Sequence, residues 1–156
     1  LTEHLDGIVR HAERETATPA EVAQANMDYE SINKVAGSYL GSGGFIVMDD
    51  STDMVDALTN LLRFYAHESC GQCTPCREGS AWMYNILCRL RDGLATEDDL
   101  VALRDLADNI HSRTICFFGA SAAMPVQSFV TKFRDEFVAR VESARAGLPA
   151  GLAVAK

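Results

Sequence analysis

Three cysteines at a regular spacing of three residues, Cys70, Cys73 and Cys76, constrain this chain more than any other feature of its sequence. A glycine and a proline separate them, and these residue types let a short loop turn sharply. Thiolates this close together suit a soft metal centre, because sulfur ligands select zinc, Cu(I) or iron-sulfur clusters. We therefore expect the loop at 68–79 to bind a metal or a cluster, with a fourth soft ligand from elsewhere.

Cys116 is the candidate for that fourth ligand, and the intervening sequence indicates how the chain returns. Apolar residues recur at helical spacing over 80–91 and again over 97–110, which predicts two helices of similar length. At 1.5 Å per residue the chain travels roughly 18 Å out and about 20 Å back. Gly93 and a capping signal at 96–99 mark the turn, so an antiparallel pair would deliver Cys116 beside the loop.

The number and spacing of the cysteines leave two kinds of metal site open. Five cysteines is an odd number, and three of them lie too close together for a disulfide framework, which favours a reducing cytosolic compartment. A structural zinc site usually takes two separated pairs of ligands. A run of three cysteines plus one remote cysteine is closer to iron-sulfur usage, so we favour a cluster over zinc.

The charge balance excludes some classes of partner. The chain of 156 residues has 14 basic and 22 acidic side chains and a net charge of -8, which is the wrong sign for a nucleic-acid surface and gives no indication of anionic membrane binding. No apolar run approaches the roughly 18 residues of a membrane span, and no leader opens the chain, so a soluble protein is expected. The first residue is Leu1, which suggests a fragment or a processed chain.

Two more amphipathic helices are predicted, over 53–67 and over 125–141, with Pro125 at the first position of the second. With the pair described above they make four helices whose apolar stripes need one shared core. The natural architecture is a mainly α four-helix bundle that holds the metal centre at one end. The aromatic side chains predicted to lie in its core are Trp82, Phe129, Phe133 and Phe137.

The segments before the bundle are shorter and less regular. A short helix and a linker are predicted over 1–18, partial helix over 20–36 and a glycine-rich turn over 37–44. The turn precedes a strand instead of following one, so a phosphate-binding role is less favoured than a simple turn. The continuous apolar run at 45–48 predicts a strand buried on both faces, whose partners would lie outside this sequence.

Five other residues each have a structural and a functional interpretation. Cys88 lies near the apolar face of its helix, where a free cysteine packs as a small hydrophobe. Arg77 and Arg113 flank the ligand segments, where a cation would offset the charge of a thiolate-bound cluster, although solvated arginine explains them equally well. His67 and His111 each end a helix, where capping is favoured over metal ligation.

The cysteine loop and two later segments carry a resemblance to a known family. The sequences are ESCGQCTPCREG at 68–79, TIC at 114–116 and PVQS at 125–128. They resemble the C-terminal part of the NADH-binding flavoprotein subunit of respiratory complex I, and diaphorase subunits of NAD-linked hydrogenases and formate dehydrogenases share the loop. Segments 27–30 and 36–44 resemble the end of that family's ubiquitin-like domain.

The resemblance implies a 4Fe-4S cluster on Cys70, Cys73, Cys76 and Cys116. The cluster would take single electrons from an FMN that NADH reduces and pass them to other iron-sulfur subunits, including a small 2Fe-2S subunit. The FMN and NADH sites are expected in an upstream domain and not in this chain. The protein would be cytoplasmic, or peripheral to the cytoplasmic face of a membrane complex.

The resemblance also implies a domain organisation. Residues 1–50 would contain the end of a ubiquitin-like α/β domain, 51–145 the helical 4Fe-4S-binding bundle, and 146–156 a disordered tail. After Cys116 the sequence departs from the family, because Phe117, Phe118, Ala120 and Met124 replace smaller, acidic or tryptophan positions. The PVQS segment nevertheless favours complex I over the hydrogenase relatives.

Overall fold

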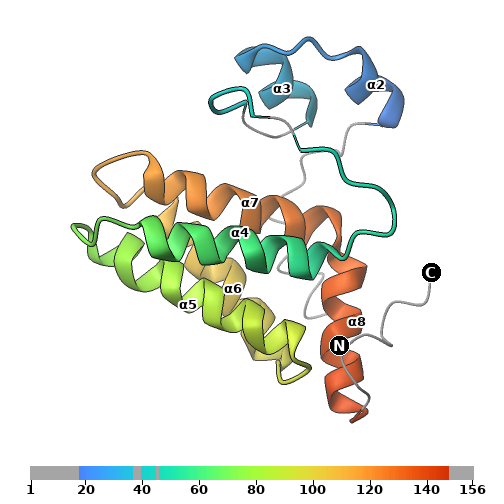
Figure 1. Cartoon of the computed structure of the whole chain (residues 1–156), viewed down its shortest axis with the longest axis vertical. Coiled ribbons are helices and arrows are strands. Elements are labelled where there is room, and N and C mark those ends of the chain that lie inside the picture. The colour runs from blue at the N-terminus through green and yellow to red at the C-terminus, as the bar shows by residue number, and fades with distance from the viewer. Residues whose placement is uncertain (1–17, 37–39, 45, 148–156) are drawn as a thin grey trace. The chain divides into compact units, whose positions relative to one another are not determined.

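A computed structural model describes residues 18–36, 40–44 and 46–147 of the chain (Figure 1). Every regular element in these ranges is a helix, which confirms the prediction of a mainly α protein. The chain divides into two units, Leu1–Thr52 and Asp53–Lys156, and each is described here by itself. Within the described ranges, the helices all fall short of the length and apolar character that a membrane crossing requires.

The first unit contains two short helices, α2 (Pro19–Gln24) and α3 (Tyr29–Ala36). Side chains cap both: Thr18 accepts a hydrogen bond from the amide of Glu21, and Asp28 accepts one from the amide of Ser31 at 2.7 Å. These helices confirm the prediction of partial helix over 20–36, which did not foresee the break between them. Residues 40–44 form a turn that is fastened to α3 by a 2.9 Å hydrogen bond from the Tyr29 hydroxyl to the Gly41 carbonyl.

The predicted buried strand is wrong over the residues that the structure describes. Residues 46–48 form no strand, and the side chains of Ile46 and Val47 are 78% and 82% exposed. A strand is stable only when neighbouring strands satisfy its backbone groups, and the described ranges supply none, so the expected α/β remnant is absent there. Phe45, the predicted helix and linker up to residue 17, and the predicted tail from 148 onward lie outside the described residues.

The second unit is built on four helices: α4 (Met54–Glu68), α5 (Thr74–Arg91), α6 (Glu97–Ile110) and α7 (Phe118–Lys132). Helix α4 packs on α5, α5 on α6 and α6 on α7, and α7 closes the bundle by contacting both α4 and α5. Their apolar stripes meet in one core, which confirms the predicted four-helix bundle. The aliphatic side chains with no exposed surface in that core are Val55, Leu58, Leu62, Met83, Leu87, Leu90, Leu103 and Val126.

The hairpin of α5 and α6 turns where the sequence predicted. Gly93 has a φ of 70°, a left-handed conformation that favours glycine. Thr96 and Asp99 form a reciprocal capping box at the start of α6, and Arg89 binds the Asp99 carboxylate at 3.1 Å. Burial raises the pKa of Asp99, but hydrogen bonds from Thr96 and Arg89 outweigh it and leave this pKa below its usual value.

The last predicted helix is wrong in its bounds. The chain forms two helices, α7 and α8 (Arg134–Arg145), separated at Phe133, and Pro125 lies inside α7 instead of at a helix start. The preceding residues are small and buried, and they show no clear apolar period, which is why the periodicity missed their helix. Those buried small residues are Gly119, Ala120, Ala122 and Ala123. Proline removes one amide donor but did not end the helix, because this small-residue turn packs against the bundle.

Helix α8 crosses the end of the bundle that lies away from the cysteine loop (Figure 1). The buried Arg140 pairs with Asp53, the residue that caps the N-terminus of α4. The carboxylate of Glu136 accepts a 3.2 Å hydrogen bond from the amide of Met54. The carboxylates of Asp53 and Glu136 thus lie at the positive end of the α4 dipole. The two contacts attach α8 to the first turn of α4.

The predicted core position is wrong for two of the aromatic residues. Trp82 is 56% exposed and Phe133 is 36% exposed, whereas Phe137 is buried as predicted and Phe129 is half-buried. Helix α5 presents the face that carries Met83 to the core, and Trp82 lies one position outside that face. Phe133 lies at the break between α7 and α8, where its ring packs against Phe129 at a centroid distance of 5.6 Å and stays partly exposed.

Replacing Leu87 by alanine should lower the free energy of unfolding by about 2–5 kcal/mol, because the lost side chain leaves a cavity among α4, α5 and α6. Leu94 is 64% exposed in the α5–α6 turn and provides a control of the same residue type. Leu94→Ala should change the free energy by no more than about 0.5 kcal/mol. Urea denaturation followed by circular dichroism measures both, and equal effects would contradict the described packing.

Candidate metal centre

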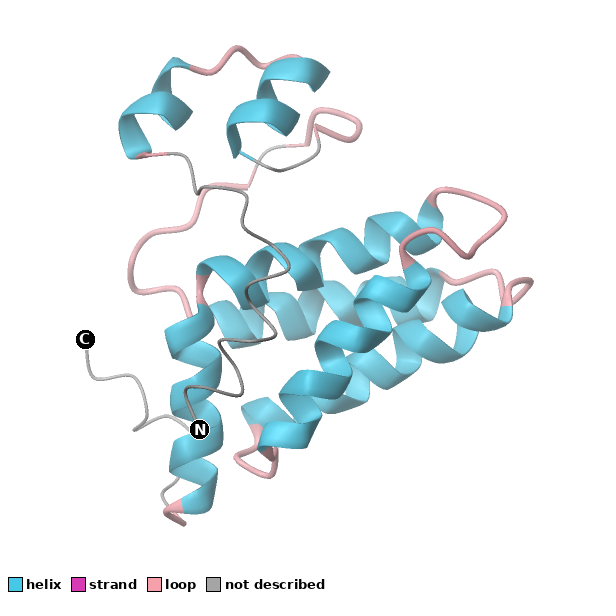
Figure 2. Cartoon of the chain, turned by 180° about the vertical axis from the view of Figure 1, so that it is seen from behind, coloured by secondary structure: helices cyan, strands magenta, loops and turns pink. Residues whose placement is uncertain are grey.

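Two connections meet at one end of the bundle. Residues 69–73 join α4 to α5, residues 111–117 join α6 to α7, and both views show them at the same end (Figures 1 and 2). The amide of Ile115 donates a hydrogen bond to the Cys73 sulfur at 3.4 Å. The matched hairpin therefore returns the segment that carries Cys116 to the cysteine loop.

The three clustered cysteines differ in their surroundings. Cys70 is exposed in the loop, Cys73 is half-buried at the position that caps α5, and Cys76 is buried in the first turn of that helix. Helix α5 begins at Thr74, six residues earlier than predicted from its apolar stripe, because Pro75 fits the first turn of a helix. The positive end of the α5 dipole thus faces the sulfurs and favours negative charge on them.

Ser69 and Gly71 shape the loop around these sulfurs. Gly71 has a φ of 78°, and its amide donates to the Ser69 hydroxyl oxygen at 3.4 Å. The same Ser69 hydroxyl lies 3.4 Å from the Cys76 sulfur. No role for Ser69 was predicted from the sequence, although its position directly before the first cysteine was the available signal.

The two flanking arginines have different roles. Arg77 reaches back and donates a 2.7 Å hydrogen bond to the carbonyl of Gly71, while its Nε binds Glu78 at 2.8 Å. It therefore ties the loop to the first turn of α5. Arg113 is exposed, and within the described ranges no hydrogen bond or ion pair joins its side chain to another residue.

Two glycines permit close approach behind the cysteines. A Cβ on Gly79, one turn after Cys76, would lie 2.9 Å from Cγ1 of Ile110, the last residue of α6. Gly119, one turn after Cys116, leaves similar room for Thr114. Each cysteine-bearing segment is thus backed by a contact in which the neighbouring side chain would have to shift if the glycine carried a Cβ.

The donor set fits an iron-sulfur cluster. All five cysteines are free thiols. The Cys73 sulfur accepts a hydrogen bond from a backbone amide, and the Cys76 sulfur lies within 3.4 Å of a hydroxyl; such groups stabilise thiolates bound to iron. In the described part of the chain, no three His, Cys, Asp or Glu side chains converge as ligands of a single ion. A cluster binds one thiolate to each iron, so its sulfur ligands stand further apart than those around one zinc.

Cys88 lies away from this end of the bundle. It follows Cys76 by twelve residues along α5, which is about 18 Å of helix. A hydrogen bond with Cys88 raises the pKa of the Tyr84 hydroxyl, so the thiol has a local partner. Cys88 is half-buried, as expected for a packing role.

His67 and His111, the histidines at helix ends, have partners other than cysteine. His67 lies in the last turn of α4, highly exposed, with its Nδ1 3.0 Å from the carboxylate of Glu68. His111 follows the last residue of α6, and its Nδ1 lies 3.2 Å from Oε1 of Gln127 in α7. Both residues therefore end helices, as expected.

Tyr65 and Phe118 pack near the cysteine end and were not predicted as a pair. Their ring centroids lie 5.4 Å apart in an edge-to-face arrangement that joins α4 to the start of α7. Burial raises the pKa of Tyr65, so its phenol stays neutral. The pair thus attaches the start of α7, two residues after Cys116, to α4.

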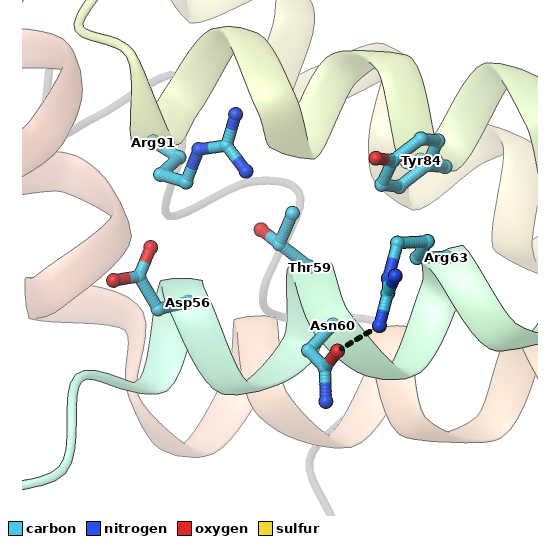
Figure 3. Close-up of a pocket in the computed structure, with 6 residues that line it drawn as sticks. All are labelled: Asp56, Thr59, Asn60, Arg63, Tyr84 and Arg91. Carbon is cyan, nitrogen blue, oxygen red and sulfur yellow. Dashed lines mark hydrogen bonds between the residues drawn. The ribbon is translucent and has the colours of Figure 1, made fainter.

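A polar hollow lies between α4 and α5 and does not include the cysteine ligands (Figure 3). Its volume is about 230 Å³, and Arg63 on its wall is already hydrogen-bonded to Asn60 at 3.0 Å. The complete lining is Asp56, Thr59, Asn60, Arg63, Tyr84 and Arg91. This lining contains no set of soft ligands, so the hollow is separate from the cysteine centre.

Comparison with known sequences matches this cysteine-bearing bundle to a family. The model of the NADH-ubiquinone oxidoreductase-F iron-sulfur binding region matches residues 56–140, a range that contains both ligand segments. The chain belongs to this family. The resemblance noted from the cysteine loop is thereby confirmed, and an iron-sulfur role is the function that the family's description carries.

Similar relatives are parts of larger complexes. The chain is 46% identical over 125 residues to the F subunit of NADH-quinone oxidoreductase of Rickettsia rickettsii (strain Sheila Smith), covering 80% of this chain and 30% of that protein. It is 48% identical over 118 residues to the F subunit of the same enzyme in Rickettsia bellii (strain OSU 85-389), covering 76% and 28%. The chain therefore spans less than a third of the length of these curated relatives.

A solved structure shares the fold. The crystal structure of NAD+-reducing [NiFe]-hydrogenase in the H2-reduced state aligns with a TM-score of 0.59 and 28% sequence identity. The alignment covers 70% of this chain and 22% of the hydrogenase chain. The bundle thus resembles a part of two kinds of protein whose names refer to NADH or NAD+.

Replacing Arg77 by glutamine should loosen the cysteine loop, because the charged bond to the Gly71 carbonyl is lost. We expect amide hydrogens of residues 69–73 to exchange faster and the thermal midpoint to fall slightly. Arg113→Gln is the matched control, since its side chain has no such bond within the described ranges, and should leave both measurements unchanged. Equal effects of the two variants would contradict the loop-closing role of Arg77.

Proposed function

We propose that this chain holds a 4Fe-4S cluster on Cys70, Cys73, Cys76 and Cys116 and transfers single electrons. The contact between the Ile115 amide and the Cys73 sulfur carries the proposal, because it brings the Cys116 segment to the loop that contains the other three thiols. Membership in a family described by iron-sulfur binding supports the same ligand chemistry. When bound, such a cluster supplies one-electron exchange at sulfur-ligated iron.

The surroundings of the four cysteines support a polarised site. Cys76 is buried at the start of α5, where the core excludes water, while Cys70 and Cys116 are exposed. Hydrogen-bond donors would lie on the bundle side of the cluster and the exposed thiols on its outer side. One edge of the cluster would then be accessible to a redox partner. Electrons would enter and leave at this exposed edge, because tunnelling through the helical core would be longer.

We further propose that the bundle serves within an NADH:quinone oxidoreductase. The names of the relatives support this, and NADH and FMN would bind in parts of the protein outside these 156 residues. This chain would pass electrons from reduced FMN to other iron-sulfur subunits, including a small 2Fe-2S subunit. The assembled complex would place the chain at the cytoplasmic face of a membrane.

Replacing any proposed ligand, Cys70, Cys73, Cys76 or Cys116, by serine should abolish the 4Fe-4S signal or convert the cluster, because one iron loses its thiolate. Cys88→Ser is the matched control and should retain full iron and sulfide per chain. Iron, sulfide and zinc content with visible absorbance, measured after anaerobic reconstitution, decide the outcome. A colourless wild-type protein with one zinc per chain would instead establish a structural zinc site and refute the cluster.

Dithionite should reduce the reconstituted cluster of this chain, whereas NADH should not, because a two-electron hydride donor needs a flavin to release electrons singly. Adding the flavin-containing remainder of the subunit, covalently or as a separate chain, should make NADH effective. Anaerobic titration with low-temperature paramagnetic resonance measures both. Rapid reduction by NADH of the flavin-free chain would reveal a nucleotide site within these residues and contradict the proposed division.

A further inference from the structure

Thr114 occupies a space that only a glycine at position 119 leaves open. A Cβ on Gly119 would lie 2.5 Å from Cγ2 and 2.6 Å from Oγ1 of Thr114, closer than real contacts allow. Gly119 is buried in the first turn of α7, and Thr114 is half-buried in the connection that leads into that helix. The start of α7 therefore holds the Thr114 side chain in place.

The same threonine is fixed at its other end. Its hydroxyl donates a 2.9 Å hydrogen bond to the carbonyl of Cys116, two residues along the chain. This bond folds the 114–116 segment back on itself, as serine and threonine commonly do in tight turns. The packing against Gly119 and the bond to Cys116 together fix the conformation of the turn.

Ile115 lies between these two fixed points, and its own side chain contributes no packing. The side chain is 84% exposed, so nothing that it contacts sets the direction of its backbone. Its amide nevertheless points at the sulfur of Cys73 at 3.4 Å, across a separation of 42 residues in the chain. The peptide that carries this amide is formed by Thr114, so the constraints on Thr114 set its orientation.

We propose that Thr114, wedged against Gly119, is a positioning residue that aims the Ile115 amide at the Cys73 sulfur and thereby raises the reduction potential of the centre. The inference rests on the proposed function and specifies how its redox potential is set. Reduction adds negative charge to a thiolate-bound cluster, and a hydrogen bond to sulfur stabilises that charge. The amide thus favours the reduced state.

The test uses two substitutions of Thr114 in the full 156-residue chain. Thr114→Val keeps the shape against Gly119 but loses the hydroxyl, whereas Thr114→Ser keeps the hydroxyl. We expect Thr114→Val to shift the midpoint potential to more negative values with unchanged iron and sulfide content. Thr114→Ser, which keeps the hydroxyl but loses the methyl group that packs against Gly119, should shift it less. Redox titration monitored by paramagnetic resonance measures the midpoint.

Gly119→Ala tests the other constraint, because the added methyl group must displace Thr114. It should shift the midpoint in the same direction as Thr114→Val. A methyl group on Gly44, in the other unit, would meet no atom within 4 Å, so Gly44→Ala is the matched control and should leave the midpoint unchanged. A midpoint that is unchanged in both Thr114→Val and Gly119→Ala would overturn the proposal.

A second measurement does not depend on the cluster. In the metal-free chain, the Ile115 amide should exchange with solvent slowly in the wild type, several-fold faster in Thr114→Val, and at an intermediate rate in Thr114→Ser. Equal exchange in all three would overturn the positioning role even if a variant failed to assemble a cluster. Failure of the proposed function is distinguishable, because the wild type itself would then bind no iron-sulfur cluster.

Discussion

The hydrogen bond from the Ile115 amide to the Cys73 sulfur joins two connections separated by 42 residues, and the centre depends on that meeting. The loop at 69–73 and the start of α5 supply three cysteines but no fourth soft ligand. The return path of α5 and α6 ends at the correct place because the hairpin turns at Gly93 and α6 is fixed at its start by the capping box. A shift of one helix along the other would separate the Ile115 amide from the Cys73 sulfur.

Rigid packing in the bundle keeps these two connections next to each other. The side chains of Met83, Leu87 and Leu103 have no exposed surface, so helices α5 and α6 cannot slide without opening cavities. At the cysteine end the glycines at 79 and 119 let side chains pack directly behind the ligand segments. The cysteine end is thus held by helices and close contacts, while Cys70 and Cys116 stay exposed. This arrangement would suit both the proposed ligand set and access for a redox partner.

Sequence patterns predicted the bundle well where the helices are amphipathic. The bounds of α4 and α6 agree closely with the prediction, because apolar residues at helical spacing must share one buried face. The sequence patterns failed where the local signal was ambiguous. Pro125 indicated a helix start but lies inside α7, since the small residues before it pack well without a clear period. The apolar run at 45–48 indicated a strand, but strand formation depends on partners that no local pattern reveals.

The sequence by itself determined the number and spacing of the cysteines, the soft character of the proposed donor set, and the hairpin that returns Cys116. Covalent spacing and helical rise fix these quantities before any packing occurs. Only the tertiary structure decided which groups surround the sulfurs. The exposure of Trp82, the closing of the loop by Arg77 and the packing of Thr114 against Gly119 could not be predicted from the sequence. Each depends on which helix faces which and on distances between segments far apart in the chain.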